Sequence, residues 1–133
     1  MSGEQVPDGL LYTSDHEWLR RDEANSDEAV IGITDFAQDQ LGDVVYLDLP
    51  AEGSEVTGGD RFGEVESVKT VSDLYAPITG EVIATNGDLE DQPELVNDSP
   101  YDEGWLIRVR LADETQLDAL LDADAYRAQL PAS

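Results

Sequence analysis

The chain has 133 residues, of which 40% are hydrophobic, and its 31 acidic and seven basic side chains give a net charge of −24 at pH 7. This length suits one domain with a hydrophobic core, and the absence of cysteine excludes disulfides, thiolate metal sites and thiol nucleophiles. The longest apolar runs are far shorter than the roughly 20 residues of a membrane-spanning helix. The polar, acidic start does not resemble a secretion signal, so we expect a cytoplasmic location.

The acidic charge also limits the partners. Nucleic acids and anionic membranes are bound mainly through lysine and arginine, so we expect neither as a partner. The acidic residues are spread from Glu4 to Asp124 instead of forming one block, which indicates a solvated surface. We interpret the charge as a halophilic adaptation to a salty cytoplasm, where salt screens self-repulsion over a few ångströms.

Hydrophobic patterning predicts mostly strands. Runs rich in β-forming residues and bounded by turn residues indicate short strands at residues 18–21, 28–34, 43–49, 62–68, 70–75, 80–85 and 104–111. The first two are separated by a polar turn and form a hairpin. We expect a Gly-rich loop at residues 51–60 and an irregular segment at 87–101, in which Pro93 begins one helical turn.

Two helical segments are predicted from capping signals and spacing. Thr34 as N-cap and Gly42 as C-terminal stop predict a short helix over residues 35–41. The leucine spacing becomes helical after Asp113, which forms a capping pair with Gln116, and the helical segment extends to about residue 130.

Alternation within the strands predicts which residues are buried. In the third strand we expect Val45, Leu47 and Leu49 on one face. In the last strand the inward residues are Trp105, Ile107, Val109 and Leu111, and those facing the other way are Leu106, Arg108 and Arg110. The expected core aromatics are Tyr12, Trp18, Tyr46 and Trp105.

These elements predict a mainly β fold. The expected architecture is a flattened β-barrel or sandwich of short strands with a short internal helix and C-terminal helices. No low-complexity linker divides the chain, so we expect a single domain over residues 1–133, with its core at about 10–111 and its C-terminal helical segment at about 113–130.

The residues needed for catalysis are scarce. His16 is the only imidazole, no serine lies in a Gly-x-Ser-x-Gly turn, and no Gly-Lys-Ser/Thr phosphate loop is present. A zinc site would rely on one histidine plus carboxylates, which is an unusual set. We therefore expect a protein that binds or carries a group, with no catalytic residues and no metal, in which His16 makes a structural hydrogen bond.

Lys69 is the only lysine, whereas the other six basic residues are arginines. It lies between two strand-like runs where the chain reverses, so its amine should project from a hairpin tip on a flexible stem. An exposed turn suits acylation, which also removes the positive charge. The alternative is an ordinary exposed lysine in an unmodified acidic interaction domain.

Several motifs lie around Lys69 and along the rest of the chain. Residues 66–69 read Glu-Ser-Val-Lys, followed by Ser-Asp at 72–73 and Ala-Pro-Ile-Thr-Gly-Glu-Val at 76–82. This segment resembles the lipoylation segment of the glycine cleavage H-protein family. Further matches are Tyr-Thr-Ser-Asp-His-Glu-Trp at 12–18, Gly-Ile-Thr-Asp-Phe-Ala-Gln at 32–38, Leu-Gly-Asp-Val-Val-Tyr at 41–46, Pro-Glu-Leu-Val-Asn at 93–97, Pro-Tyr at 100–101 and Gly-Trp-Leu at 104–106.

The residues on either side of Lys69 can be compared with those beside the modified lysine in two related classes of carrier protein. Biotin carriers usually place methionines beside their lysine, and lipoyl domains of 2-oxoacid dehydrogenases typically place an aspartate directly before it. Here the neighbours are Val68 and Thr70. Both departures favour the H-protein family, and a biotin carrier domain remains an alternative.

The resemblance implies a carrier with lipoate in amide linkage on Lys69 and no catalysis of its own. Its implied partners are pyridoxal-phosphate-dependent glycine decarboxylase, which loads an aminomethyl group, the tetrahydrofolate-dependent aminomethyltransferase, which takes the one-carbon unit, and dihydrolipoyl dehydrogenase, which reoxidises the dithiol. A lipoyl-attaching enzyme is a fourth. We expect the carrier to be a monomer.

The loaded arm ends in a cationic amine, which calls for an apolar groove with carboxylates at the amine end, because a desolvated ammonium needs an opposite charge. Glu17 and Asp73 are the candidates for these carboxylates. The resemblance implies in addition that Glu66 and Ser67 help partner enzymes to recognise the turn.

Overall fold

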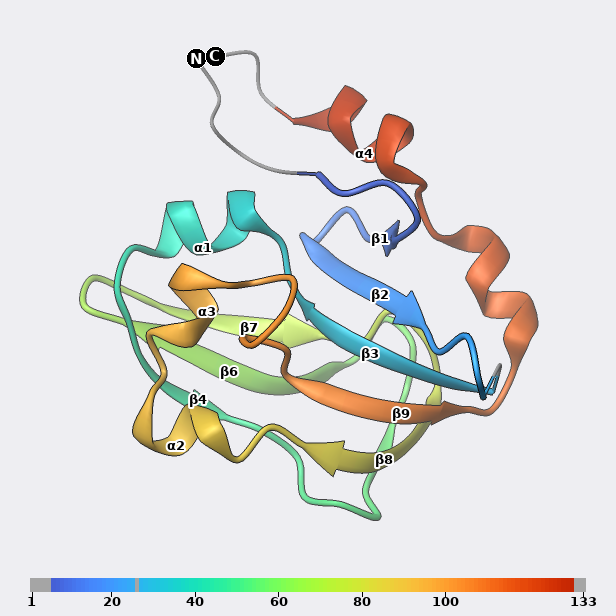
Figure 1. Ribbon diagram of the computed structural model, residues 1–133, viewed down its shortest axis with the longest axis horizontal. Helices are drawn as coiled ribbons and strands as arrows, with labels where there is room; N and C mark the ends of the chain where they lie inside the picture. Colours follow the sequence, from blue (N-terminus) through green and yellow to red (C-terminus); the bar gives the residue numbers. More distant parts are fainter. Residues whose placement is uncertain (1–5, 26, 131–133) are drawn as a thin grey trace.

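The computed structural model describes residues 6–25 and 27–130, which form two antiparallel sheets with short helices around them (Figure 1). Residues 1–5 and 131–133 of the expected domain, and with them Glu4, lie outside the described residues, as does Ser26 in the predicted hairpin turn. The larger sheet has the strand order β1 (Leu11–Tyr12), β2 (Glu17–Arg21), β3 (Glu28–Ile33), β9 (Ile107–Leu111), β8 (Gly80–Thr85) and β5 (Glu55–Val56). The smaller sheet has the order β4 (Val44–Asp48), β6 (Arg61–Ser67) and β7 (Val71–Tyr75).

The helical elements are short. They are α1 (Asp35–Leu41), α2 (Asp88–Asp91), α3 (Leu95–Asp98), the 3₁₀ helix η1 (Glu114–Ala119) and α4 (Ala123–Gln129). None of these helices is long and apolar enough to span a membrane. Helix α1 begins and ends where its capping residues predict, since the Thr34 hydroxyl accepts a hydrogen bond from the Ala37 N–H and Gly42 has a φ of 77°.

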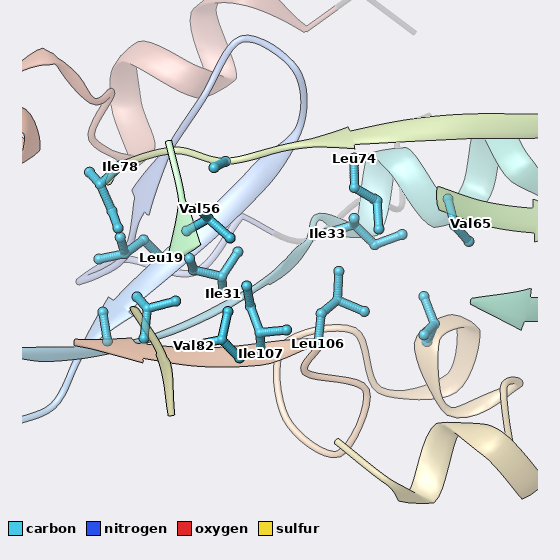
Figure 2. Close-up of a cluster of buried hydrophobic side chains, with 14 of the residues drawn as sticks. Leu19, Ile31, Ile33, Val56, Val65, Leu74, Ile78, Val82, Leu106 and Ile107 are labelled. Carbon is cyan, nitrogen blue, oxygen red and sulfur yellow. The ribbon is translucent and has the colours of Figure 1, made fainter. Parts of the chain in front are cut away.

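The main core lies between the two sheets (Figure 2). Leu19, Ile31 and Ile107 from the larger sheet face Val65 and Leu74 from the smaller one, and all are fully buried or nearly so. A second cluster packs where α4 meets the first strands, and its fully buried aromatics are Tyr12, Trp18 and Tyr126. The predicted mainly β sandwich is confirmed, although its two sheets do not close into a barrel.

The predicted inward face of the third strand is wrong at its start. Strand β4 has a bulge between Val44 and Tyr46, where its register against β6 shifts. The extra residue changes the alternation, so Val44 is buried while Val45 is 50% exposed and Tyr46 is 54% exposed. Tyr46 is therefore not a core aromatic, whereas Tyr12 and Trp18 are, and Trp105 packs half-buried against the second cluster.

The remaining differences arise from pairing that local patterns do not reveal. The Gly-rich loop contains β5, which pairs with β8, and the irregular segment contains both α2 and α3. The last strand begins at Ile107, three residues later than the predicted start at residue 104, so Leu106 lies outside the alternation of the strand and is buried. At the start of η1, Asp113 accepts a hydrogen bond from the Thr115 N–H, but Gln116 does not complete the capping pair, because its side-chain oxygen accepts from the Thr79 N–H.

Candidate functional site

Lys69 lies in the tight turn between β6 and β7, the green loop at the left of Figure 1. The Ser67 hydroxyl oxygen accepts hydrogen bonds from the N–H groups of Lys69, at 3.3 Å, and Thr70, at 3.2 Å. The Ser67 N–H donates to the Thr70 carbonyl at 2.8 Å. The side chain of Ser67 thus fixes the shape of the turn, and Lys69 is exposed at its tip, as the sequence predicts.

The turn is also fastened to the neighbouring chain. The Val68 N–H donates to the Asp43 carbonyl at 3.0 Å. One residue earlier, the Gly42 carbonyl accepts from the Asn97 side-chain amide at 2.8 Å, and the Asn97 oxygen accepts from the Val44 N–H at 2.9 Å. A backbone hydrogen bond therefore holds the tip of the hairpin to the α1–β4 junction, and Asn97 of α3 in turn binds that junction.

The stem of Lys69 lies beside Gly42 at ordinary contact distance. A Cβ added at Gly42 would lie 3.5 Å from Cε of Lys69. No carboxylate in the described parts of the chain forms an ion pair with Lys69. The amine is therefore accessible to an acylating enzyme.

A groove of about 380 Å³ begins beside this turn, at Thr70. We call it the α1–β7 groove, because one wall is helix α1 and another is strand β7, and residues 14–17 line it as well. Its apolar lining residues are Ile33, Phe36, Ala37, Leu41, Val65 and Leu74. Strand β7 leads away from the lysine at about 3.3 Å per residue, so the far end of the groove at Tyr75 lies on the order of 15 Å from Thr70.

Glu17 lies at this far end and is only 2% exposed. One of its carboxyl oxygens accepts from the Thr13 hydroxyl at 2.7 Å and the other from the Tyr75 N–H at 3.3 Å. Burial raises the pKa of Glu17 to about 8, even though both hydrogen bonds favour the charged form. The carboxyl is therefore mostly protonated at neutral pH, and a cation entering the groove would favour its ionisation.

Asp73 lies in the same groove but in a different environment. Its side chain is 45% exposed and accepts a hydrogen bond from Nε of Arg61 at 3.0 Å. Its other oxygen lies 3.4 Å from the Tyr75 hydroxyl, which donates to it. Tyr75 thus contacts both acids, with its backbone bound to Glu17 and its hydroxyl bound to Asp73. The structure brings together the two carboxylates that the sequence analysis selected.

The other two predicted residues lie on the hairpin itself. Glu66 is half-buried in β6, opposite Tyr46 on one side and Val71 on the other. Ser67 is engaged within the turn, so its hydroxyl shapes the loop from which Lys69 projects.

His16 makes the structural hydrogen bond expected of it. Its Nδ1 lies 2.8 Å from the Tyr126 hydroxyl, and its ring centroid lies 4.7 Å from that of Phe36. Burial lowers the pKa of His16 below its ordinary value, which favours the neutral ring. The contacts of Tyr126, Tyr75 and Thr13 with His16 and Glu17 are not predictable from the sequence. Nothing in the local pattern shows that a tyrosine from the C-terminal helix or a β7 amide reaches this loop.

The pKa of Glu17 predicts how its burial affects stability. Between about pH 4.5 and pH 8 the folded state holds a proton at Glu17 that the unfolded state has lost, so ionisation of Glu17 destabilises the fold as pH rises through this window. A Glu17→Gln variant has no ionisable group at this position, so this contribution to the loss of stability with rising pH is absent. In urea unfolding its stability relative to the parent should therefore increase from pH 5 to pH 8, by at most about 1.4 kcal/mol per pH unit.

A matched variant separates this effect from the general repulsion within an acidic chain. Glu90→Gln removes one exposed acid from α2, outside the groove. The difference between this variant and the parent should stay nearly constant over the same pH range. A constant difference for Glu17→Gln as well would contradict the assignment of a buried, protonated carboxyl.

The arrangement fits a long, flexible and largely apolar group attached at Lys69. The amine is exposed, the groove beside it has apolar walls, and two acidic residues, Glu17 and Asp73, are among the residues that line it. Such a groove can shelter the end of an attached chain from water, because apolar walls exclude water while the carboxyl groups satisfy a charge.

Comparisons with known proteins identify related sequences and a related structure. The glycine cleavage H-protein family matches residues 10–132. Glycine cleavage system H proteins of Listeria monocytogenes serotype 4a and Magnetococcus marinus are 54% and 57% identical over 125 residues, covering 94% of this chain and 98% and 87% of theirs. The crystal structure of a glycine cleavage system H protein from Mycobacterium marinum is similar with a TM-score of 0.81 and 38% identity, over 93% of this chain and 98% of that one.

Proposed function

The chain belongs to the glycine cleavage H-protein family, the lipoyl carriers of the glycine cleavage system, and from this premise we propose that Lys69 is the residue that carries its lipoyl group. The observation that carries the proposal is the position of Lys69, exposed at the tip of a hydrogen-bonded turn that opens onto the α1–β7 groove. It is also the only lysine in the chain, so no other side chain offers an ε-amine for the amide.

The lipoyl group supplies the redox-active sulfurs of a carrier that works between glycine decarboxylase, the aminomethyltransferase and dihydrolipoyl dehydrogenase. The protein's own contribution is to present the lysine amine at the turn and to shelter the attached arm in the groove. Ser67 keeps the turn in one shape, so the backbone of Lys69, from which the amine projects, is held in place. The apolar groove walls exclude water, and we propose that Glu17 and Asp73 hold the cationic end of the loaded arm.

We also propose that Glu66 and Ser67 serve recognition of the turn by the lipoyl-attaching enzyme. The support is their position, since both directly precede the segment that such an enzyme must grip to reach Lys69. In this proposal Ser67 acts through the shape of the turn and Glu66 through its carboxylate beside it.

The intact mass of protein isolated from its native cell tests the attachment, with fragmentation to locate any added group. A lipoyl increment on Lys69 supports the proposal. A biotinyl increment at the same residue would instead indicate a biotin carrier, and an unmodified chain under conditions of glycine degradation would indicate an acidic interaction domain without a cofactor.

We further propose that the chain has no catalytic activity of its own and acts as a monomeric, single-domain carrier over residues 1–133 in a cytoplasm of high ionic strength. The support for the last point is the net charge of −24, because salt screens repulsion among so many carboxylates. The melting temperature should therefore rise with potassium chloride between about 0.1 M and 1 M, where the Debye length falls from about 10 Å to 3 Å. A melting temperature that falls or stays constant would count against this adaptation.

A further inference from the structure

The C-terminal helix α4 places one polar group against two segments that adjoin the α1–β7 groove. Figure 1 shows α4, in red, beside β1 and across the view from the lysine-bearing hairpin. Its Tyr126 is fully buried, and the hydroxyl lies 2.8 Å from Nδ1 of His16 and 2.7 Å from the hydroxyl of Thr34. These two partners are 110 and 92 residues away in the chain, so one oxygen atom joins three distant segments.

The first partner, His16, belongs to the loop that leads into Glu17, the first residue of β2, and we call residues 13–17 the Glu17 loop. His16 has a φ of 70°, a left-handed conformation that residues other than glycine rarely adopt. Such a conformation persists only where surrounding contacts hold it. Here the contacts are the Tyr126 hydroxyl, the Phe36 ring and a 3.0 Å hydrogen bond from the Thr34 N–H to the His16 carbonyl. Because Glu17 is the next residue, the conformation of His16 affects the direction in which the chain enters β2 and presents the Glu17 side chain, whose carboxyl is held by Thr13 and Tyr75.

The second partner belongs to the start of helix α1. The Thr34 hydroxyl caps this helix through the Ala37 N–H, at 3.2 Å, and Phe36 and Ala37 line the groove. The Tyr126 hydroxyl therefore connects two lining segments of the groove, the Glu17 loop and helix α1, at the point where they meet.

We propose that Tyr126 is a positioning residue, whose hydroxyl holds the Glu17 loop against the start of α1 and thereby keeps the far end of the α1–β7 groove closed around the end of the arm. This inference rests on the proposed function, since it concerns a groove that the arm occupies. Tyr126 itself does not line the groove and acts through His16 and Thr34.

The chain offers a matched control in the same aromatic cluster. Tyr12 stacks on Tyr126 with ring centroids 4.7 Å apart and an angle of 10° between the rings. The Tyr12 hydroxyl donates to the Pro7 carbonyl, away from the groove. Tyr126→Phe and Tyr12→Phe therefore remove one hydroxyl each from the same stack, but only the first removes a bond to the groove segments.

Two measurements test the proposal. In the lipoate-free protein, the ring-nitrogen NMR signals of His16 should shift in Tyr126→Phe and stay in place in Tyr12→Phe. In lipoylated protein loaded with the aminomethyl group, release of the amine to water should be about fivefold faster in Tyr126→Phe, the factor that corresponds to one neutral hydrogen bond, and should match the parent in Tyr12→Phe. Urea unfolding of both variants reports any general loss of stability.

The outcomes separate this inference from the proposed function. Parent-like His16 signals and release in Tyr126→Phe would overturn the positioning role, as would an equal acceleration in Tyr12→Phe. If Lys69 carries no lipoyl group, the proposed function fails and the positioning role fails with it. If replacing Glu17 and Asp73 leaves the release rate unchanged, the groove assignment and the positioning role fail while the attachment at Lys69 stands. A sheltered amine in the parent, exposed by changes at Glu17 and Asp73 but not at Tyr126, would remove the positioning role alone.

Discussion

Lys69→Arg is expected to abolish lipoyl attachment and all support of glycine cleavage while leaving the fold intact. The guanidinium keeps the positive charge and a stem of similar length, but it stays protonated and cannot form the amide. Lys69 is exposed and forms no ion pair with the described carboxylates, so folding gains little from it. Intact mass after incubation with the lipoyl-attaching enzyme, glycine decarboxylation with the partner enzymes, and the melting temperature together check the prediction.

The reverse substitution, arginine to lysine at a position away from the turn, provides the control. Arg110→Lys adds a second amine on the exposed face of β9, outside the groove and the turn. Only Lys69 should be modified in that variant, because attachment requires the turn as well as an amine. Modification at position 110, or turnover by Lys69→Arg, would contradict the assignment.

A Glu17→Gln Asp73→Asn variant is expected to lose its loaded amine to water at least about tenfold faster than the parent, which corresponds to about 1.4 kcal/mol of lost stabilisation. The amides keep the size of both side chains but cannot carry the negative charge that a desolvated ammonium needs. The measurement is the rate of amine release from the isolated, loaded protein, followed by intact mass.

The two single variants apportion this effect between a buried acid and an exposed one. Glu17 is buried and mostly protonated before a cation arrives, whereas Asp73 is half-exposed and paired with Arg61. Since charge interactions strengthen with burial, Glu17→Gln should account for more of the acceleration. Glu90→Gln Asp91→Asn makes the same two types of substitution at exposed positions of α2 and should release the amine at the parent rate. Equal release in the groove variant and in this control would remove the groove assignment.

Local signals in the sequence predict a large part of this fold. The β2–β3 hairpin and helix α1 each have their turn or capping residues within a few positions of the element, so short-range rules are sufficient. The candidate lysine was found in the same way, because a single lysine among arginines at a chain reversal is visible in composition and spacing alone.

The sequence-based predictions that are wrong depend on contacts between distant segments. The β4 bulge depends on how the strand pairs with β6, and this register reverses the exposure expected for Val45 and Tyr46. The Tyr75 N–H reaches Glu17 across 58 residues. No periodicity within a single segment encodes that approach. The sequence thus selects two acids that line one groove, but the hydrogen bonds that orient them require the assembled sheets.

The anchoring of the hairpin has a consequence for how far the attached group can travel. The Val68 N–H of the turn donates to the Asp43 carbonyl, and Asn97 binds the backbone of Gly42 and Val44 on either side of Asp43. The backbone at the attachment point is therefore held in place, and the attached group moves by rotation about the single bonds beyond the Lys69 Cα. A short tether on a stationary pivot samples a small volume, so the local concentration of its free end near any docked enzyme is high, in the millimolar range typical of short linkers. Weak and brief encounters with several enzymes are then sufficient for transfer.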